Sequence, residues 1–313
     1  MTKQTPLVCI VGPTASGKSS LAVDLAKRLD AEIVSADSMQ IYRGMDILTA
    51  KVTQEEMRGI AHHLLGFLDL DSDYSVADYV EDASRVIGDI HARGKLPFLV
   101  GGTGLYISSL IDNIQYADIP SCSSLREELN QRARTQGLVP LWKELASFDP
   151  VSAQKLHPND QKRIIRAIEI YRLSGKTKSE WDALSKAEPS PYHTYQIGLT
   201  APREFLYDRI NRRVDQMIQN GLVEEAFEIY RKCPESQTAG QAIGYKELVP
   251  YFEGKCSLEQ AAQSIKQETR RYAKRQLSWF NRDQRINWID CSKPIDVPQI
   301  CVDIRTYFQT ERR

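Results

Sequence analysis

A glycine-rich loop near the start of the chain has the residue types that bind phosphate. Residues 12–19 read GPTASGKS and match the pattern G-x-x-x-x-G-K-[ST]. In such a loop the backbone N–H groups surround phosphate oxygens, the lysine reaches the outer phosphate, and the next hydroxyl binds Mg²⁺. Gly12, Gly17, Lys18 and Ser19 fill these roles. The loop predicts a site for a diphosphate or triphosphate, without identifying the molecule that carries it.

Two further loops have groups suited to the same site. Asp37 ends an apolar run, where a carboxylate fits a Mg²⁺ ligand, a general base, or the N-cap of a following turn. Residues 101–106 read GGTGLY and form a second glycine-rich turn, whose N–H groups and Thr103 hydroxyl suit an anion. Together the three loops predict an anionic substrate with a metal or a proton transfer nearby.

Short apolar strands must position these loops. The pattern predicts strands at Pro6–Pro13, Glu32–Ala36 and Pro97–Val100, with a helix at Ser19–Leu29 after the first. Continuous apolar strands separated by helices indicate a parallel sheet covered on both faces. Ligands of such α/β folds gather at the carboxyl ends of the strands, where the three loops lie.

The middle of the chain has a different residue pattern. From about Pro120 to Pro189, β-branched runs give way to polar helical patterns, so we expect an all-helical insertion at 121–188 within a core made of 1–120 and 189–313. The core resumes with a strand at Tyr195–Leu199 and three helices, followed by a short terminal helix. The helices expected on both sides of this strand are Leu125–Gln136, Val139–Leu145, Asp160–Leu173, Lys178–Leu184, Arg203–Gln219, Val223–Lys232, Leu258–Trp279 and Gln299–Arg313.

Basic side chains are concentrated in three segments of a chain whose formal net charge is zero. Between Lys266 and Arg285 there are seven basic side chains against two acidic ones, which favours a polyanion groove over a merely solvated face. Aromatic residues are interleaved with them, as in sites that stack unpaired bases. The other two clusters are Lys155, Lys162, Arg163, Arg166 and Arg172 in the insertion, and Arg209, Arg212 and Arg213 after it.

Composition excludes several classes of protein. The chain has 313 residues, of which 42% are hydrophobic and 26% charged, and this is typical of a folded globular protein of about two domains. It has no apolar run long enough for a membrane span and no signal-peptide pattern, so we expect a cytoplasmic protein without membrane contact. The six cysteines form no C-x-x-C pair and are expected to be reduced thiols, and the histidines lack zinc-ligand spacing.

At this point the motifs resemble those of one family along nearly the whole chain. They are GPTASGKS at 12–19, DSMQIY at 37–42, GGTGLY at 101–106, HPND at 157–160, IGY at 243–245 and KRQLSWF at 274–280. The set is similar to the bacterial tRNA dimethylallyltransferases, the P-loop type of tRNA isopentenyltransferase. The resemblance implies a parallel-sheet P-loop core flanked by helices, with the helical insertion clamping the anticodon stem of tRNA.

The resemblance also implies a reaction. The dimethylallyl group of dimethylallyl diphosphate would pass to N6 of the adenosine 3′ of the anticodon, in tRNAs that read codons starting with U, leaving diphosphate. Mg²⁺ would be the cofactor, with Ser19 as its protein ligand, and the adenosine would be flipped out of its loop. Asp37 would accept the proton of the amine or orient it, and Thr103 would hydrogen-bond an oxygen of the diphosphate.

Two sets of binding residues follow from the resemblance. The diphosphate would contact Gly12, Thr14, Ala15, Ser16, Gly17, Lys18, Ser19, Arg209 and Arg213. The tRNA would contact Ser38, Met39, Gln40, Asp160, Gln161, Lys162, Arg163, Ile164, Gln241, Ile243, Gly244, Tyr245, Lys246, Arg271, Lys274, Arg275, Gln276 and Trp279. A monomer is expected.

The chain departs from the family pattern at two places, and two other functions compete. Leu48 and Val52 stand where relatives usually have glycine and proline around Thr-Ala-Lys, and Asn281 stands where a basic residue is common. These departures affect the loop near Lys51 and one phosphate contact. The competing functions are a P-loop kinase or RNA-dependent NTPase, with Asp37 as the base, and a non-enzymatic RNA-binding module. Some relatives prenylate free adenine nucleotides, but the insertion and the basic helix favour tRNA.

Overall fold

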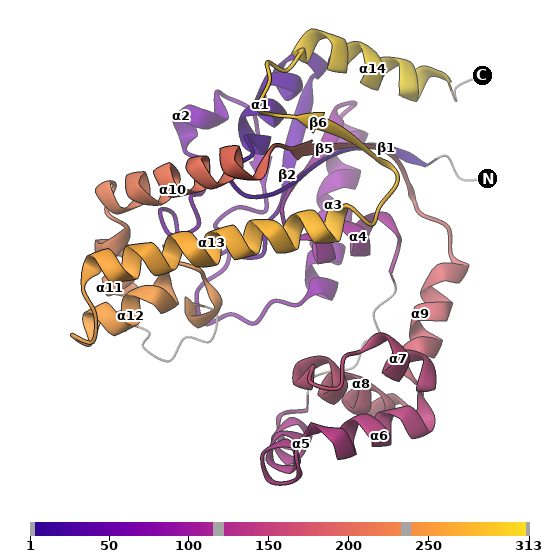
Figure 1. Ribbon diagram of the computed structural model, residues 1–313. Coiled ribbons are helices and arrows are strands. Elements are labelled where there is room, and N and C mark those ends of the chain that lie inside the picture. The colour runs from indigo at the N-terminus through magenta and orange to yellow at the C-terminus, as the bar shows by residue number, and fades with distance from the viewer. Residues whose placement is uncertain (1–3, 115–121, 233–238, 311–313) are drawn as a thin grey trace. The chain divides into compact units, whose positions relative to one another are not determined.

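The computed structural model describes residues 4–114, 122–232 and 239–310 (Figure 1). The chain forms two compact units, one made of Met1–Leu110 with Pro191–Arg313 and the other of Ile111–Ser190. Cys233, expected to be a reduced thiol, and the last residues of the expected terminal helix lie outside the described ranges. No helix within those ranges combines the length and apolar character needed to cross a membrane.

A six-stranded parallel sheet forms the centre of the first unit, which confirms the predicted α/β fold. Its order is β3-β2-β4-β1-β5-β6. The strands are β1 (Thr5–Val11), β2 (Ala31–Ala36), β3 (His62–His63), β4 (Leu96–Gly101), β5 (Tyr192–Thr200) and β6 (Ile286–Asp290). The register pairs Ala36 with Gly101, so Asp37 and the glycine-rich turn leave the sheet at the same level.

Helices pack on the central strands because these strands are apolar on both faces. Val8 and Ile10 of β1 share a core with α1 (Lys18–Leu29) and α14 (Val297–Thr310). Helix α3 (Val76–Ala92) contacts β2 and β4, and the buried Tyr79 hydroxyl donates to the Ser35 carbonyl at 2.9 Å. The ring of Tyr79 stacks on Tyr106 of α4 (Gly104–Ile111), with ring centroids 4.0 Å apart.

A second apolar core lies among the C-terminal helices. It contains Ile41, Met45 and Leu48, which follow β2, together with side chains such as Val214 and Ile265. The helices that contribute side chains to it are α10 (Arg203–Gln219), α11 (Leu222–Lys232), α12 (Tyr245–Phe252) and α13 (Leu258–Phe280). The short η1 (Ala239–Gln241) contacts α12, and α2 (Gln54–Met57) has no buried side chain. The segment after Asp37 is thus anchored in a helical layer, and α10 packs on α13.

The second unit is all-helical and has its own core, in which Leu129, Leu141 and Ile168 are fully buried. Its helices are α5 (Ser123–Gln136), α6 (Leu138–Phe148), α7 (Pro150–Lys155), α8 (Gln161–Ser174) and α9 (Lys178–Ala187). Ile164, a predicted RNA contact, is 0% exposed in this core. The apolar face of α8 buries it, so its side chain serves packing and the predicted contact through that side chain is wrong.

The four strands and the main helices expected from the sequence are confirmed to within a few residues. The sequence pattern did not predict β3, β6 or the helices α2, α3, α7 and α12; of these helices α7 (Pro150–Lys155) is short. β3 has only two residues, and β6 is mostly half-buried at the sheet edge, so neither has the continuous apolar run used to recognise strands.

Candidate functional site

The glycine-rich loop at 12–19 has the backbone geometry of a phosphate cradle. Gly12 has φ 137°, and a Cβ there would lie 2.6 Å from the carbonyl oxygen of Leu199, so only glycine fits. Gly17 adopts a left-handed conformation as the N-cap of α1 and leaves that helix without a side-chain cap. The Ser16 hydroxyl is buried and has no hydrogen-bond partner within the described residues. Unsatisfied donors at a helix N-terminus favour an anion.

Three cations surround this cradle without a carboxylate partner. Lys18 donates from Nζ to the Pro13 carbonyl at 2.7 Å, and desolvation, with the positive charge of Arg213, lowers its pKa to about 7. Burial also lowers the pKa of Arg213, while the guanidinium of Arg209 lies 3.6 Å from the Cβ that Gly17 lacks. Within the described ranges none of the three forms an ion pair, although the charge of Asp37 raises the pKa of Lys18 and Arg213, so the cradle keeps an excess of positive charge.

One cavity of about 1390 Å³ brings together most of the predicted site residues of the first unit. A pocket for one small ligand has about 300–1000 Å³, so this cavity has room for more than one substrate group. The predicted site residues that line it are Thr14, Ala15, Gly17, Lys18, Ser19, Asp37, Ser38, Met39, Gln40, Arg209, Arg213, Gln241, Ile243, Lys246, Arg275 and Gln276.

Asp37 and Thr103 are joined through the segment that follows β2. One carboxylate oxygen of Asp37 accepts from the backbone N–H of Met39 at 2.9 Å and of Gln40 at 3.3 Å. The Thr103 hydroxyl oxygen accepts from the Ser38 N–H at 3.0 Å. Asp37 therefore caps its own turn, as one of the alternatives predicted, and it also lines the cavity. The turn fixes the carboxylate beside the cations.

One face of α13 rests on the second glycine-rich turn. Gln276 is 5% exposed; its amide oxygen accepts from the Thr14 N–H at 2.8 Å and its amide nitrogen donates to the Gly102 carbonyl at 3.0 Å. A Cβ on Gly102 would lie 2.1 Å from that nitrogen. Both ends of the Gln276 amide bind inside the protein and join the two glycine-rich loops, so these hydrogen bonds give Gln276 a structural role, and its predicted RNA contact stays a prediction.

Tyr272 lies one turn before Gln276 on α13, and the sequence motifs assign it no site role. It lines the cavity, and burial raises the pKa of its hydroxyl, although the side chains of Thr103 and Gln276 oppose that rise. Trp279 lies over Gly104, where an added Cβ would be 2.3 Å from the indole Cδ1. The i, i+4, i+7 spacing of these three side chains is the signal that was available in the sequence.

The remaining residues predicted to contact RNA differ in whether their side chains are exposed and unengaged within the described part of the protein. Lys274 and Arg275 have no carboxylate partner within the described ranges, whereas Arg271 pairs with Glu268 at 2.5 Å. Gly244 has φ 107° and Tyr245 is buried, so they shape α12 rather than present side chains. In the second unit Asp160 caps α8 through the Arg163 N–H, Gln161 donates to Asn130, and Lys162 is exposed.

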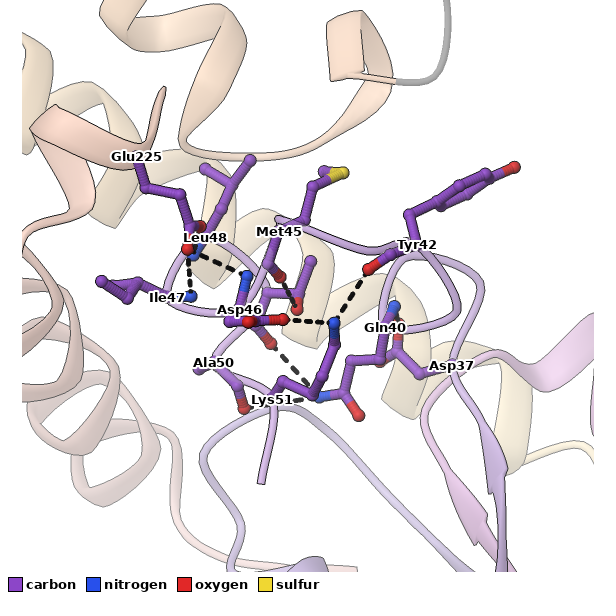
Figure 2. Close-up of polar contacts among 11 residues, drawn as sticks. Asp37, Gln40, Tyr42, Met45, Asp46, Ile47, Leu48, Ala50, Lys51 and Glu225 are labelled. Atoms are coloured by element: carbon purple, nitrogen blue, oxygen red, sulfur yellow. Dashed lines mark hydrogen bonds and ion pairs between the residues drawn. The ribbon is translucent and has the colours of Figure 1, made fainter. Parts of the chain in front are cut away.

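The loop with unusual residues at 48 and 52 is closed by internal hydrogen bonds (Figure 2). Lys51 Nζ donates to the Tyr42 carbonyl at 2.8 Å and to the Asp46 carboxylate. Leu48 is 4% exposed and its Cδ1 fills the space over Gly244, 2.8 Å from where a Cβ would be. Leucine is therefore accommodated by a glycine on the facing segment. Asn281 is the C-cap of α13.

Comparisons with known proteins agree along the whole chain. A model of the family described as IPP transferase matches residues 40–283, and one described as Isopentenyl transferase matches residues 5–73. The chain is 46% identical over 301 residues to the tRNA dimethylallyltransferase of Halalkalibacterium halodurans, with 96% of each chain covered. It is 47% identical over 296 residues to that of Bacillus subtilis strain 168, with 95% of this chain and 94% of the relative covered.

Two solved structures are similar as well. The crystal structure of a full-length tRNA isopentenylpyrophosphate transferase from Bacillus halodurans has a TM-score of 0.74 and 44% identity, covering 99% of this chain and 100% of that one. A eukaryotic dimethylallyltransferase acting on tRNA has a TM-score of 0.83 and 29% identity, covering 99% of this chain and 80% of that one.

Proposed function

Because the chain belongs to the IPP transferase family, as its motifs predict, we propose that it transfers the dimethylallyl group of dimethylallyl diphosphate to a tRNA. The acceptor is N6 of the adenosine 3′ of the anticodon. The observation that carries the proposal is the cavity of about 1390 Å³, in which the phosphate cradle, Asp37 and the α13 cation Arg275 face one space. This space is larger than a small-molecule pocket requires.

The side chains around the cavity fit a displacement at the allylic carbon. As the bond from N6 to that carbon forms, the carbon–oxygen bond to diphosphate breaks, and the amine must lose a proton. Asp37, held by the N–H groups of Met39 and Gln40, is placed to accept it. Lys18, Arg209 and Arg213 neutralise the charge that develops on the leaving diphosphate.

The cavity also has hard oxygen donors of the kind that Mg²⁺ prefers. Ser19 begins the exposed part of α1 and lines the cavity with Asp37. No group of three His, Cys, Asp or Glu side chains within the described ranges is arranged to hold a metal ion. This donor set fits Mg²⁺, which takes one or two protein ligands and otherwise binds substrate phosphates and water. When bound, the ion would neutralise diphosphate charge, with Ser19 as its ligand.

The wider assignments belong to the same proposal. The helical unit clamps the anticodon stem, Lys274 and Arg275 contact the RNA backbone, and the enzyme acts as a cytoplasmic monomer on tRNAs reading codons that start with U. Phosphate contacts of this kind position an RNA, whereas a flipped base identifies the nucleotide.

A transfer assay tests the proposed function. The purified protein is incubated with Mg²⁺, labelled dimethylallyl diphosphate and an unmodified anticodon stem-loop, beside a stem-loop whose target adenosine is guanosine, and ATP hydrolysis is followed in parallel. Label is expected only in the adenosine RNA. RNA-stimulated ATP turnover without transfer would instead identify an NTPase, and the phosphate cradle would then be a nucleotide site.

Asp37→Asn sharpens the assay. Asparagine retains the oxygen that accepts from Met39 and Gln40, so the turn stays formed, but it cannot accept a proton. Turnover is expected to fall by about 10²–10⁴-fold, while the dissociation constant for the stem-loop stays within a factor of about two. Equal losses in turnover and RNA affinity would contradict the role of Asp37 as a base.

A further inference from the structure

The carboxylate of Glu225 binds three consecutive backbone N–H groups of a loop that is far away in the sequence. One oxygen accepts from Asp46 at 3.0 Å and Ile47 at 2.9 Å, and the other accepts from Leu48 at 2.7 Å. Figure 2 shows this fan of hydrogen bonds from the helix to the loop. We define residues 46–52, all of which line the cavity, as the cavity loop.

Glu225 is a firm anchor for this loop. It lies on α11, whose Leu222, Ala226 and Ile229 are buried in the second core. Successive N–H groups that converge on one point carry partial positive charge, and a carboxylate with two oxygens can satisfy all three. A glutamine in its place offers one oxygen, and its NH₂ group would face an N–H group.

The far end of the same loop binds two predicted site residues. The Ala50 carbonyl accepts from Arg213 Nη2 at 3.2 Å and from Gln40 Nε2 at 3.4 Å. Gln40 also donates to the Thr49 carbonyl at 3.2 Å. Ala50 has φ 45°, a left-handed conformation that a residue other than glycine keeps only when its surroundings hold it.

Two backbone bonds join the ends of the loop. The Ala50 N–H donates to the Ile47 carbonyl at 2.9 Å, and the Lys51 N–H donates to the Asp46 carbonyl at 2.8 Å. Asp46 and Ile47, whose N–H groups donate to Glu225, thus accept the hydrogen bonds of Lys51 and Ala50 through their carbonyl groups. A continuous set of hydrogen bonds runs from Glu225 to the guanidinium of Arg213 beside the phosphate cradle.

We propose that Glu225 is a positioning residue for the diphosphate site, because it fixes the cavity loop so that the Ala50 carbonyl orients Arg213 toward the phosphate cradle. Glu225 acts through Arg213 and has no contact with substrate in this role. The activity assays rest on the proposed function, whereas direct diphosphate binding does not.

The first experiment compares E225Q with E224Q. Glu224 is the exposed neighbour on the same helix and provides a matched change of charge. E225Q is expected to raise KM for dimethylallyl diphosphate about tenfold, as for the loss of a charged hydrogen bond, with kcat and the KM for the stem-loop within about threefold. Glu225→Asp keeps the charge but shortens the side chain, and the same rise in KM is expected. Variants indistinguishable from E224Q would overturn the proposal.

A double-mutant cycle with Arg213→Lys distinguishes positioning from general stabilisation. If Glu225 acts through Arg213, E225Q has little further effect on KM once the guanidinium is gone, whereas independent effects multiply. Multiplying effects would overturn the proposal. Calorimetric titration of inorganic diphosphate with Mg²⁺ repeats the cycle without the transfer step. A wild-type protein that binds diphosphate but transfers no prenyl group would refute the proposed function, and the binding cycle would still decide the role of Glu225.

Discussion

The arginines of the helical unit and the cations around the cavity have opposite electrostatic surroundings. In the helical unit Arg166 contacts Glu169 at 2.7 Å, and Arg172 contacts Glu144 at 2.7 Å and Glu128 at 3.1 Å. Around the cavity Lys18, Arg209 and Arg213 have no such partner within the described ranges. Both regions have clusters of basic residues in the sequence, and composition alone does not separate them.

Paired arginines contribute to the stability of the fold, whereas cations without a carboxylate partner are available to bind an anionic ligand. A paired arginine has its carboxylate already, and a phosphate must compete for it, whereas an unpaired cation held beside other cations gains from any anion that enters. Desolvation lowers the pKa of Lys18 to about 7, which is a cost in the ligand-free protein. We infer that the cavity is built for a polyanion and that much of the helical cluster is structural.

Among the variants that test this comparison, Lys18→Met is expected to have the largest effect. Loss of the cation should lower kcat/KM for dimethylallyl diphosphate by about 10³-fold. The same change should raise the melting temperature, because methionine is buried without the desolvation cost of an ammonium group. Thermal unfolding and initial rates on one preparation measure both effects.

The pH dependence of this stabilisation has a defined sign. Lys18 has a pKa of about 7 in the folded protein and 10.5 as a model value, so the unfolded state binds more protons between these values. The stability advantage of Lys18→Met should be largest at or below pH 7 and decline toward pH 10.5. A variant that is less stable than wild type at every pH would contradict the account of Lys18.

Arg275→Ala and Arg172→Ala compare an arginine that has no carboxylate partner among the described residues with a paired one. Arg275 lines the cavity, and its loss should weaken stem-loop binding about tenfold and reduce the salt dependence of log K by about one unit. Arg172 is held by two glutamates, and its loss should change RNA affinity by less than about twofold. Fluorescence anisotropy titrations at several salt concentrations measure both. If both variants had the same salt dependence of log K, ion pairing would not distinguish the cavity cations from the arginines of the helical unit.

The loops of the site were predictable because their signals are local. Each consists of a short apolar strand, a glycine-rich or acidic turn and the start of a helix, so residues 12–19, Asp37 and Thr103 are recognised within a few positions of chain. The sheet then brings them to one level through the pairing of Ala36 with Gly101.

The contacts that hold those loops were not predictable in the same way. Gln276 and Thr14 are 262 positions apart, and Glu225 and Leu48 are 177 positions apart. No local period encodes which buried amide meets which N–H group. Gln276 and Ile164 were therefore assigned to RNA from neighbouring motif residues, although the faces of their helices direct them into the protein. A motif gives the neighbourhood of a side chain, and packing gives its direction.

The affinity for diphosphate should depend on pH through Lys18. A bound diphosphate favours the charged ammonium group, so above pH 7 binding takes up a proton and affinity falls as pH rises, by at most about tenfold per unit. Calorimetry in buffers of different ionisation enthalpy measures the uptake at pH 8. Lys18→Arg stays charged and should lack this part of the uptake. Identical proton uptake in both proteins would assign the dependence to the ligand.

Arg166→Met has the smallest expected effect on activity and a clear effect on stability, opposite in sign to that of Lys18→Met. Glu169 is 0% exposed and accepts from Arg166, Arg126 and the Cys122 N–H. Loss of Arg166 leaves the buried carboxylate short of one partner and should cost about 1–3 kcal/mol in the free energy of unfolding. Arg163→Met, which removes an exposed pair at 3.4 Å, should cost less than about 0.5 kcal/mol. Urea unfolding followed by circular dichroism measures both. A paired arginine stabilises its unit, whereas the desolvated Lys18 lowers the stability of the ligand-free protein. Changes in stability of the same sign for Arg166→Met and Lys18→Met would therefore contradict the distinction between the two regions.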